Sequence, residues 1–289
     1  MIIVRLSGGL GNQMFQYAAA LALARAHGAQ LRFDLEWFDT RQLHQGLELA
    51  HVFGLELPRA TASERWRVLG WVAPPFLRRA LSRRSLRLRR LGIEPYFHYW
   101  PGFCELPADV FLDGYWQSEK YFAPIADEIR QAFRFAEPLD ARNAELFDEM
   151  AQRESVALHV RRGDFARDPH VRQVHGVDLN DYFCRAIEEI GARVASPHYH
   201  VFSDEPEWVR EHLSIPASWT CIDQNRGRES YRDMQLMGLC RHNIIANSSF
   251  SWWGAWLNQS PGKIVIAPKK WFVHEVNTTD LIPSEWLVI

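Results

Sequence analysis

Two arginines, a histidine and a carboxylate leave the carboxyl end of a predicted strand together, as His159, Arg161, Arg162 and Asp164. The apolar run before them, residues 155–158, is typical of a buried strand in a parallel sheet. Ligands of open α/β sheets bind at that edge, and a guanidinium presents a planar, charged fork that suits phosphate oxygens. The spacing therefore predicts an anion site, with a surface cluster of salt bridges as the alternative.

A glycine-rich turn follows the first predicted strand. Gly9 and Gly11 allow a ligand to approach the backbone, and the helix start that follows favours anions. Both glycines also fit a dinucleotide fingerprint whose third glycine is replaced by Met14, so a nicotinamide-dependent oxidoreductase is a weak alternative. The amides of Asn12 and Gln13 both donate and accept hydrogen bonds, which suits a hydroxyl-rich ligand such as a sugar. Helix capping by Asn12 is the structural alternative.

Polar residues follow two further predicted strands in the second half of the chain. Asp204 either caps the next helix or accepts hydrogen bonds from the ribose or base of a nucleotide. Ser248, Ser249 and Phe250 open a helix, where hydroxyls and free N–H groups form a phosphate cradle. Asp233, taken alone, reads as an ordinary helix carboxylate.

The elements that must position these residues alternate between strand and helix, which implies parallel sheets covered by helices. The predicted strands are 2–6, 30–34, 110–116, 155–160, 199–203, 220–223, 243–246 and 263–267. The predicted helices are 12–27, 121–133, 144–152, 180–193, one from 206 onward, 229–240 and 250–258. Trp252, Trp253 and Trp256 recur at helical spacing and are expected in the core.

The length of 289 residues fits two domains, and a net charge of −2 excludes a chain-wide nucleic-acid binder. We place an N-terminal domain at 1–150 and a C-terminal domain at 151–289. The polar stretch 136–143 marks the boundary region, and helix 144–152 fits either side. A basic helical insertion at about 61–92 carries many arginines. It is either a solvated hairpin or a patch that rests on an anionic membrane or a charged acceptor.

Four motifs occur in order from Gly8 to Leu257: GGLGNQMFQYAAALALA, HVRRGDF, FSDEPEW and NSSFSWWGAWL. With them the chain resembles the bacterial α-1,2-fucosyltransferases of glycosyltransferase family 11. The resemblance implies an α/β, GT-B-like fold of two Rossmann-like domains that face each other across a cleft. It places the acceptor with the N-terminal domain and GDP-fucose with the C-terminal domain. The implied reaction is inverting, metal-independent transfer of L-fucose from GDP-β-L-fucose to the 2-hydroxyl of a terminal galactose.

The same resemblance assigns roles around the leaving diphosphate. Arg161 is expected to bind the β-phosphate, and His159 to lie against the α-phosphate or the nucleoside. Ser248, Ser249 and Phe250 are expected to cradle the phosphates. The sequence has no Asp-x-Asp motif of the kind that holds a divalent cation on a sugar nucleotide. Preorganised donors would then have to stabilise the developing charge.

Other expected roles concern the guanine base, the reacting sugar and the general base of the reaction. Asp233 corresponds to a carboxylate that contacts guanine, and Asn12 to an amide near the reacting sugar. The general base is not identified by the sequence, and Asp164, Asp168 and His175 are the nearest candidates. Arg162 would point to the opposite side of an extended chain, where a structural ion pair is expected.

We expect no cofactor and no nucleic-acid partner. The expected ligands are GDP-L-fucose and a galactose-terminated oligosaccharide or lipid-linked glycan. The chain begins at its first strand, so we expect a cytoplasmic protein, with peripheral contact at the inner membrane face through residues 65–90. A fucosyltransferase of α-1,6 linkage and a non-catalytic carbohydrate-binding protein are the alternatives.

Overall fold

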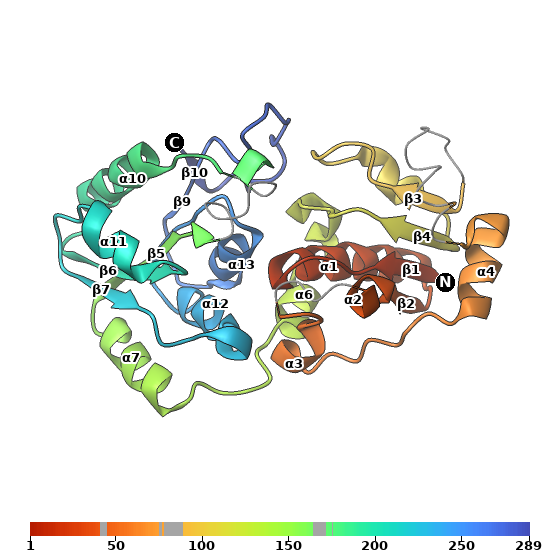
Figure 1. Ribbon diagram of the computed structural model, residues 1–289, viewed down its shortest axis with the longest axis horizontal. Coiled ribbons are helices and arrows are strands. Elements are labelled where there is room, and N and C mark those ends of the chain that lie inside the picture. The colour runs from red at the N-terminus through yellow and green to blue at the C-terminus, as the bar shows by residue number, and fades with distance from the viewer. Residues whose placement is uncertain (41–44, 75–76, 78–88, 164–171, 175) are drawn as a thin grey trace. The chain divides into compact units, whose positions relative to one another are not determined.

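The computed structural model describes all residues except 41–44, 75–76, 78–88, 164–171 and 175 (Figure 1). The chain forms two compact units. Unit 1 comprises Met1–Ala136 and Thr279–Leu281, and unit 2 comprises Glu137–Thr278 and Ile282–Ile289. Among the described residues, each unit has its own parallel sheet with helices packed against it, as the alternation of elements predicted.

The sheet of unit 1 has the strand order β2-β1-β4-β3 in the described part of the chain. Its parallel strands are β1 (Ile2–Arg5), β2 (Leu31–Asp34), β3 (Leu91–Ile93) and β4 (Val110–Asp113). Strand β1 is central, and the side chains of Ile2, Ile3 and Val4 are fully buried. Strand β3 was not predicted, because three residues are too few to show a periodic pattern.

Helix α1 (Leu10–His27) begins two residues earlier than predicted, with Gly9 as its N-cap. It ends at Gly28, whose φ of +57° is the left-handed conformation that glycine adopts without strain. Over its described ranges, unit 1 also contains the α-helices α2 (Glu36–Thr40), α3 (Leu49–Phe53), α4 (Ala62–Leu69) and α6 (Ala126–Ala132). Its 3₁₀ turns are η1 (Gly70–Val72), η2 (Pro101–Glu105), η3 (Glu119–Tyr121) and η4 (Ala123–Ile125).

Two boundaries in unit 1 differ from prediction. The strand expected over 110–116 ends at Asp113, because Gly114 starts a turn in which Trp116 has a φ of +56°. The helix expected over 121–133 is two 3₁₀ turns followed by α6, with Pro124 in the first turn of η4. Proline has no N–H to donate, which interrupts a continuous helix at this point.

The basic insertion is described only at its two ends. Helix α4 begins with a capping box, in which the hydroxyl of Thr61 accepts a hydrogen bond from the N–H of Glu64 and the carboxylate of Glu64 accepts one from the N–H of Thr61. All the arginines from Arg78 to Arg87 lie outside the described residues.

The sheet of unit 2 has the order β10-β9-β8-β5-β6-β7 in its described residues, and all its pairings are parallel. Its strands are β5 (Glu154–Val160), β6 (Pro197–Ser203), β7 (Trp219–Ile222), β8 (His242–Ile244), β9 (Val265–Ala267) and β10 (Leu287–Val288). The helical elements in the described part of this unit are α7 (Ala141–Ala151), α10 (Asn180–Arg193), α11 (Pro206–His212), η5 (Gly227–Glu229), α12 (Tyr231–Met237) and α13 (Ser249–Leu257).

Successive residues of β5 face opposite sides of the sheet. Val156, Leu158 and Val160 pack with α10 and α11, whereas Ala157 packs with α7 and α12. The three tryptophans of α13 are buried, which confirms their predicted place in the core.

The division between the units lies between Ala136 and Glu137, within the polar stretch 136–143 that we expected to mark the boundary region, although we placed the domain limit at residue 150. Helix α7 belongs to unit 2, because its Leu146 and Met150 share a core with Ala157 of β5 and Leu236 of α12. Burial of this apolar side decides which unit the helix joins.

Candidate functional site

The carboxyl edge of the unit 2 sheet brings together three of the four sequence motifs. Strand β5 lies between β6 and β8, with Val160 opposite Ser203 and Leu158 opposite Ile244. The segments that leave these strands therefore begin side by side. They are Arg161–Gly163, Asp204–Glu205 and Asn247–Ser249.

His159 is the penultimate residue of β5, on the same face of the sheet as Ala157, and only 6% of its surface is exposed. Its Nδ1 atom is buried and has no hydrogen-bond partner among the described residues, and its ring centroid lies 6.0 Å from that of Phe250. Burial, followed by the positive charge of Arg161, lowers the pKa of His159 to about 3. The imidazole is therefore neutral at physiological pH, and its Nδ1 atom can form a hydrogen bond with a ligand or a water molecule.

Arg161 is held by Asp204 from the neighbouring strand. The Nη1 atom of Arg161 lies 2.9 Å from Oδ2 of Asp204, and the Oδ1 atom of Asp204 accepts a hydrogen bond of 3.0 Å from the N–H of Arg162. The capping interpretation of Asp204 is wrong, since Glu205 is the N-cap residue of α11. One carboxylate thus fixes both the backbone and the guanidinium of the arginine segment.

Because Gly163 has no side chain, there is room beside it for the carboxylate of Asp204. A Cβ atom on Gly163 would lie 2.5 Å from Oδ2 of Asp204, closer than real Cβ contacts come. A larger residue at this position would therefore displace the carboxylate of Asp204 from its contact with Arg161.

Arg162 has the structural role that the sequence predicted. Its Nε atom lies 3.6 Å from Oε2 of Glu205, and its guanidinium carbon lies 3.8 Å from the ring centroid of Trp208. An ion pair and a cation–π contact therefore anchor it to the start of α11.

Helix α13 presents its N-terminus at the same edge. Ser248 is the N-cap residue, and its hydroxyl accepts a hydrogen bond of 3.3 Å from the N–H of Phe250. The side chain of Asn247 donates to the carbonyl of Trp271 over 3.0 Å, which fixes the approach to the helix. The first N–H groups of such a helix attract anions. The expected cradle residues Ser248, Ser249 and Phe250 thus lie beside His159.

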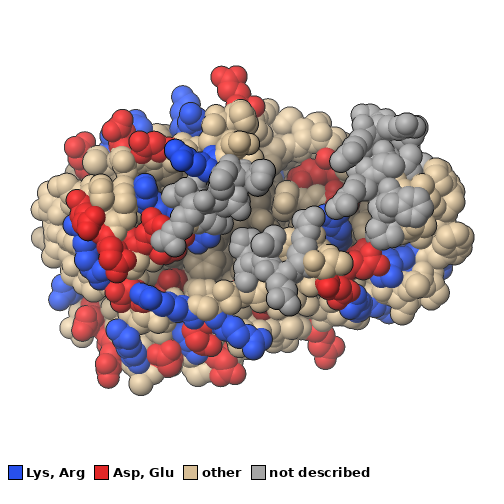
Figure 2. Space-filling view, in the orientation of Figure 1, with Lys and Arg blue, Asp and Glu red and all other residues tan. Residues whose placement is uncertain are grey.

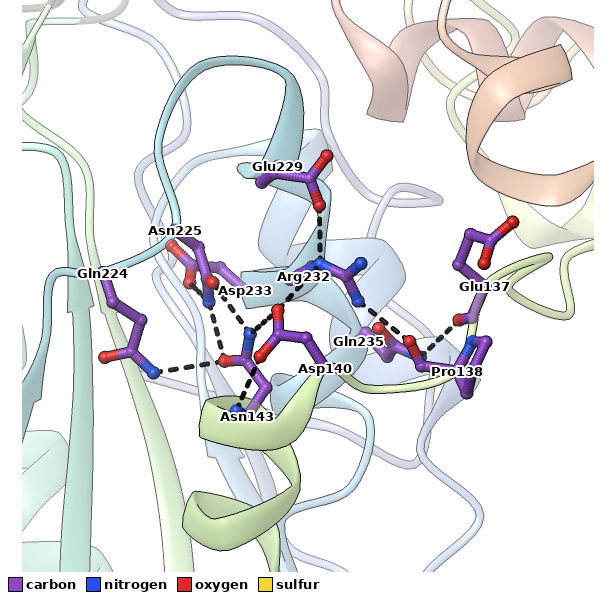
Figure 3. Close-up of polar contacts among 10 residues, drawn as sticks. All are labelled: Glu137, Pro138, Asp140, Asn143, Gln224, Asn225, Glu229, Arg232, Asp233 and Gln235. Carbon is purple, nitrogen blue, oxygen red and sulfur yellow. Dashed lines mark hydrogen bonds and ion pairs between the residues drawn. The ribbon is translucent and has the colours of Figure 1, made fainter.

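Asp233 belongs to a buried polar network between α7 and α12 (Figure 3). Nδ2 of Asn225 donates to Oδ1 of Asp233 over 2.8 Å. Burial raises the pKa of Asp233 to about 7, although the hydrogen bond from Asn225 acts in the opposite direction. This carboxyl is therefore far from the ordinary helix carboxylate that its sequence context suggested.

Asn143 is the centre of that network and was not predicted from the sequence. Its Oδ1 atom accepts hydrogen bonds of 3.1 Å from both Gln224 and Asn225, and its Nδ2 atom donates to Asn225 and to Asp140. Asp140 is also the N-cap residue of α7 and accepts from the N–H of Asn143. The start of α7 therefore determines where Asn225 lies.

Arg232 connects this polar network to the residues that precede α7. Its Nε atom lies 2.6 Å from Glu229 and 3.3 Å from Asp140, and its Nη1 atom donates to the carbonyl of Pro138 over 3.0 Å (Figure 3). No spacing pattern in the sequence signals this set of contacts, because its members come from three separate elements.

Asn12 lies in the first turn of α1 in unit 1. Its Oδ1 atom accepts a hydrogen bond of 2.7 Å from Nε2 of Gln117. The capping interpretation of Asn12 is wrong, because Gly9 is the N-cap residue and no side chain caps the helix. Gly8 has a φ of +78°, and a Cβ there would lie 2.7 Å from Nδ2 of Asn12.

The side chain of Gln13 is fully buried and forms hydrogen bonds with backbone groups from two segments of unit 1. Its Nε2 atom donates to the carbonyls of Gly8 and Gly46, and its Oε1 atom accepts from the N–H of Glu48. We therefore give it a structural role in place of the expected contact with substrate. Gly9 and Gly11 form the start of α1, and the carbonyl of Gly9 accepts hydrogen bonds from the N–H groups of Asn12 and Gln13.

Two carboxyls of unit 1, those of Glu48 and Glu94, were not predicted from the sequence and have raised pKa values. Burial raises the pKa of Glu48 to about 7, although the N–H of Leu10 donates to its carboxylate. Burial also raises the pKa of Glu94 to about 7, against the effect of two backbone hydrogen bonds from Tyr115 and Trp116. Glutamates outside a recognisable motif carry no signal of burial.

The base candidates Asp164, Asp168 and His175 lie outside the described residues. In the part of the chain that the structure describes, no group of three or more His, Cys, Asp or Glu side chains is arranged to hold a metal ion. Figure 2 shows acidic and basic side chains interspersed over the visible face, in keeping with the small net charge. None of the helices in the described ranges is both long and apolar enough to cross a membrane.

Comparison with known proteins places this chain among sugar-transferring enzymes. The alpha-1,2-colitosyltransferase of Escherichia coli is 33% identical over 100% of this chain and 99% of its own length. The O-antigen biosynthesis glycosyltransferase WbnK of Escherichia coli is 31% identical over 98% of both chains. The galactoside alpha-(1,2)-fucosyltransferase 1 of Sus scrofa is 29% identical over 86% of this chain and 63% of its own length.

The fold is similar to that of solved fucosyltransferases. NodZ alpha-1,6-fucosyltransferase soaked with GDP-fucose matches with a TM-score of 0.54 and 15% identity, over 89% of this chain and 92% of NodZ. NodZ from Bradyrhizobium in selenomethionine form matches with a TM-score of 0.50 and 15% identity, over 88% and 90% of the two chains. The expected GT-B-like class of two α/β domains is thereby confirmed.

The match to a family completes the assignment. Residues 85–289, which include the arginine segment, Asp233 and α13, match the family described as Glycosyl transferase family 11. Two relatives above 30% identity match nearly the whole chain as well. These matches confirm the family resemblance that the four sequence motifs indicated. The chain belongs to glycosyl transferase family 11 and is a glycosyltransferase.

Proposed function

We propose that this protein transfers L-fucose from GDP-β-L-fucose to the 2-hydroxyl of a terminal galactose, with inversion and without a metal ion. The observation that carries the proposal is the grouping of Arg161, the unpartnered Nδ1 of His159 and the N-terminus of α13 at one sheet edge. This grouping supplies a charged fork, a neutral imidazole and backbone N–H donors to a diphosphate.

Arg161 is the residue to which we assign the leaving group. Charge develops on the β-phosphate as its bond to fucose breaks, and a guanidinium already held by Asp204 needs no reorganisation to meet it. The hydroxyls of Ser248 and Ser249 and the ring of Phe250 would complete the cradle. Positioning and stabilisation of the leaving group would then supply most of the acceleration.

Asp233 is the residue to which we assign the guanine base. An ionised carboxylate only accepts hydrogen bonds, and guanine offers N–H donors on its Watson–Crick edge. The hydrogen bond from Asn225 favours the ionised state that this contact needs.

In the reaction, the acceptor hydroxyl would attack the sugar on the face opposite GDP through an oxocarbenium-like state. Asp164 and His175 remain our candidates for the base that takes the hydroxyl proton, and Asn12 our candidate near the reacting sugar. The scheme needs no cofactor, and the nucleotide sugar enters it as the donor substrate.

A second candidate donor follows from one relative. The alpha-1,2-colitosyltransferase of Escherichia coli matches this chain end to end. Transfer of a colitosyl group in α-1,2 linkage is therefore the alternative activity that we propose to test beside fucosyl transfer. The similarity to NodZ alpha-1,6-fucosyltransferase is one of fold alone, at 15% sequence identity. It therefore gives less support to α-1,6 linkage than the sequence relatives give to α-1,2 linkage.

The test is a turnover assay with the purified protein, GDP-L-fucose and lactose in the presence of EDTA, with product linkage read by NMR. We expect fucose on O2 of galactose. Transfer from GDP-colitose but not from GDP-fucose would replace the donor in the proposal. Loss of activity in EDTA that Mg²⁺ or Mn²⁺ restores would contradict metal independence.

A further inference from the structure

The carboxyl edge of the unit 1 sheet gathers segments from three neighbouring strands. Strand β4 lies between β1 and β3, with Leu112 opposite Val4 and Asp113 opposite Ile93. The Gly-rich turn after β1, the segment from Glu94 after β3 and the turn 114–117 after β4 therefore leave the sheet side by side. This is the edge at which parallel sheets bind ligands.

The turn 114–117 has a strained backbone. Trp116 has a φ of +56°, a left-handed conformation that is unfavourable for a bulky residue, and its side chain is fully buried. Phe103 and Tyr121 pack against its indole, with ring centroids 5.0 and 5.4 Å away. The surrounding structure must therefore impose this conformation, which is typical of functional positions.

Glu94 supplies the main polar restraint on that turn. Its Oε2 atom accepts a hydrogen bond of 2.7 Å from the N–H of Tyr115, and its Oε1 atom accepts one of 3.0 Å from the N–H of Trp116. Gly114 allows this approach, since a Cβ on it would lie 2.5 Å from Cβ of Glu94. The carbonyl of Gly114 accepts a further hydrogen bond of 3.1 Å from Gln16 in α1.

The restrained turn orients Asn12. Gln117 comes directly after the strained residue, and its Nε2 atom donates to Oδ1 of Asn12 over 2.7 Å. This bond fixes which end of the Asn12 amide is the acceptor, so its nitrogen lies over Gly8. Glu94, Gln117 and Asn12 thus form a continuous chain of contacts from β3 to the start of α1.

Aromatic rings flank the chain of contacts at the surface. Tyr115 is 45% exposed and Tyr96 is 41% exposed, although large aromatic side chains are usually buried. Tyr96 stacks on His98 with centroids 3.9 Å apart and an interplanar angle of 12°. Flat rings beside fixed amides suit a ligand with an apolar C–H face and a rim of hydroxyls, which describes a pyranose.

We propose that Glu94 and Gln117 are positioning residues for the sugar acceptor, because they place Tyr115 and orient the amide of Asn12, the two side chains that contact it. The inference rests on the proposed function, since it assumes a glycan acceptor. Glu94 acts by holding the turn that places Tyr115 and orients Asn12. The donor nucleotide is assigned to unit 2, so changes at Glu94 or Tyr115 leave nucleotide affinity intact.

The experiment compares four variants with the wild-type enzyme: Tyr115→Ala, Tyr115→Phe, Glu94→Gln and the control Glu105→Gln, an exposed carboxylate of the same unit. The readouts are the KM for lactose at saturating GDP-fucose, the Kd for GDP by calorimetry and the melting temperature. We expect Tyr115→Ala and Glu94→Gln to raise the KM for lactose at least tenfold while the Kd for GDP changes less than twofold. Tyr115→Phe keeps the ring and should restore the KM, and Glu105→Gln should match the wild type.

The outcomes separate this inference from the proposed function. If the wild-type enzyme transfers fucose but Tyr115→Ala keeps a normal KM for lactose, the acceptor site is wrong and the function stands. If Glu94→Gln raises the KM for lactose and the Kd for GDP together, its role is structural and the positioning role is overturned. If the wild-type enzyme fails to transfer fucose to any galactoside, the proposed function fails first. Should Glu94→Gln not fold, Gln117→Ala tests the same chain of contacts.

Discussion

Asn225 donates a hydrogen bond of 2.8 Å to the carboxylate of Asp233, and the same amide is fixed by a reciprocal pair of hydrogen bonds with Asn143. The side chain that we assign to guanine is thus oriented by residues of another helix and another loop (Figure 3). This relationship gives Asn225 a measurable role in base selection.

Substitution of Asn225 by alanine should weaken GDP binding more than ADP binding. The variant removes the donor that favours an ionised Asp233, and adenine lacks the N–H donors that an ionised carboxylate would accept from guanine. Calorimetry with both nucleotides measures the ratio of the two Kd values. Gln235→Ala on the same helix serves as the control, and an unchanged GDP-to-ADP ratio in Asn225→Ala would remove the role of the network.

GDP affinity should fall as the pH falls through about 7. Asp233 has a raised pKa of about 7, so its carboxyl is ionised above that pH and gains a proton below it. A protonated carboxyl loses acceptor capacity toward guanine. The phosphates titrate equally in GDP and ADP, so the ratio of the two affinities isolates Asp233.

Asp233→Asn should flatten that pH profile. It should also raise the free energy of unfolding at alkaline pH. A carboxyl whose pKa is raised by folding contributes its stability below its unfolded pKa and loses it as the pH rises through the folded value. A wild-type profile without inflection between pH 6 and 8 would contradict the assignment.

Arg161→Ala should weaken GDP binding by about 1.5–3 kcal/mol, the usual worth of a hydrogen bond to a charged group. The loss in kcat/KM should be larger, because the β-phosphate gains charge in the transition state. Arg161→Lys should rescue poorly, since an ammonium lacks the planar fork. Steady-state kinetics with GDP-fucose check this, and near-normal turnover in Arg161→Ala would remove the centre of the proposed function.

Gly163→Ala should impair the enzyme nearly as much as Asp204→Ala. The new Cβ would lie 2.5 Å from Oδ2 of Asp204 and would displace the carboxylate that holds Arg161. The matched control is Gly191→Ala in α10, where a Cβ meets nothing within 4 Å and should stabilise the helix by roughly 0.5–1 kcal/mol. The measurements are kcat/KM and the melting temperature, and full activity in Gly163→Ala would show that Asp204 does not depend on this approach.

Trp66 and Trp71, at 59% and 60% exposed, lie at the described end of the basic insertion. We expect flotation with vesicles that contain anionic lipids, and reduced flotation of the double variant Trp66→Ala and Trp71→Ala. Indole rings favour the membrane interface, and arginines favour anionic headgroups. Neutral vesicles are the control. Protein that stays in the soluble fraction with anionic vesicles would exclude membrane contact through this segment.

The sequence by itself determined the alternation of strands and helices and the place of His159, Arg161 and α13 at strand ends. Apolar periodicity and glycine signals are local, so elements such as α10 and the buried strand β5 are readable without any tertiary information. The short strands β3 and β10 carry too few residues for a pattern, and only pairing with their neighbours makes them strands.

Only the tertiary structure decided the roles of several polar side chains. Asp204 pairs with Arg161 and is not the N-cap residue of α11. The amide of Gln13 forms hydrogen bonds with backbone groups. Helix α7 belongs to unit 2 because Leu146 and Met150 are buried in its core. The restraint of Trp116 by Glu94 and the link from Asn143 to Asp233 join residues far apart in the chain. Hydrogen bonds and burial depend on distances in space, and no local spacing of residue types encodes those distances.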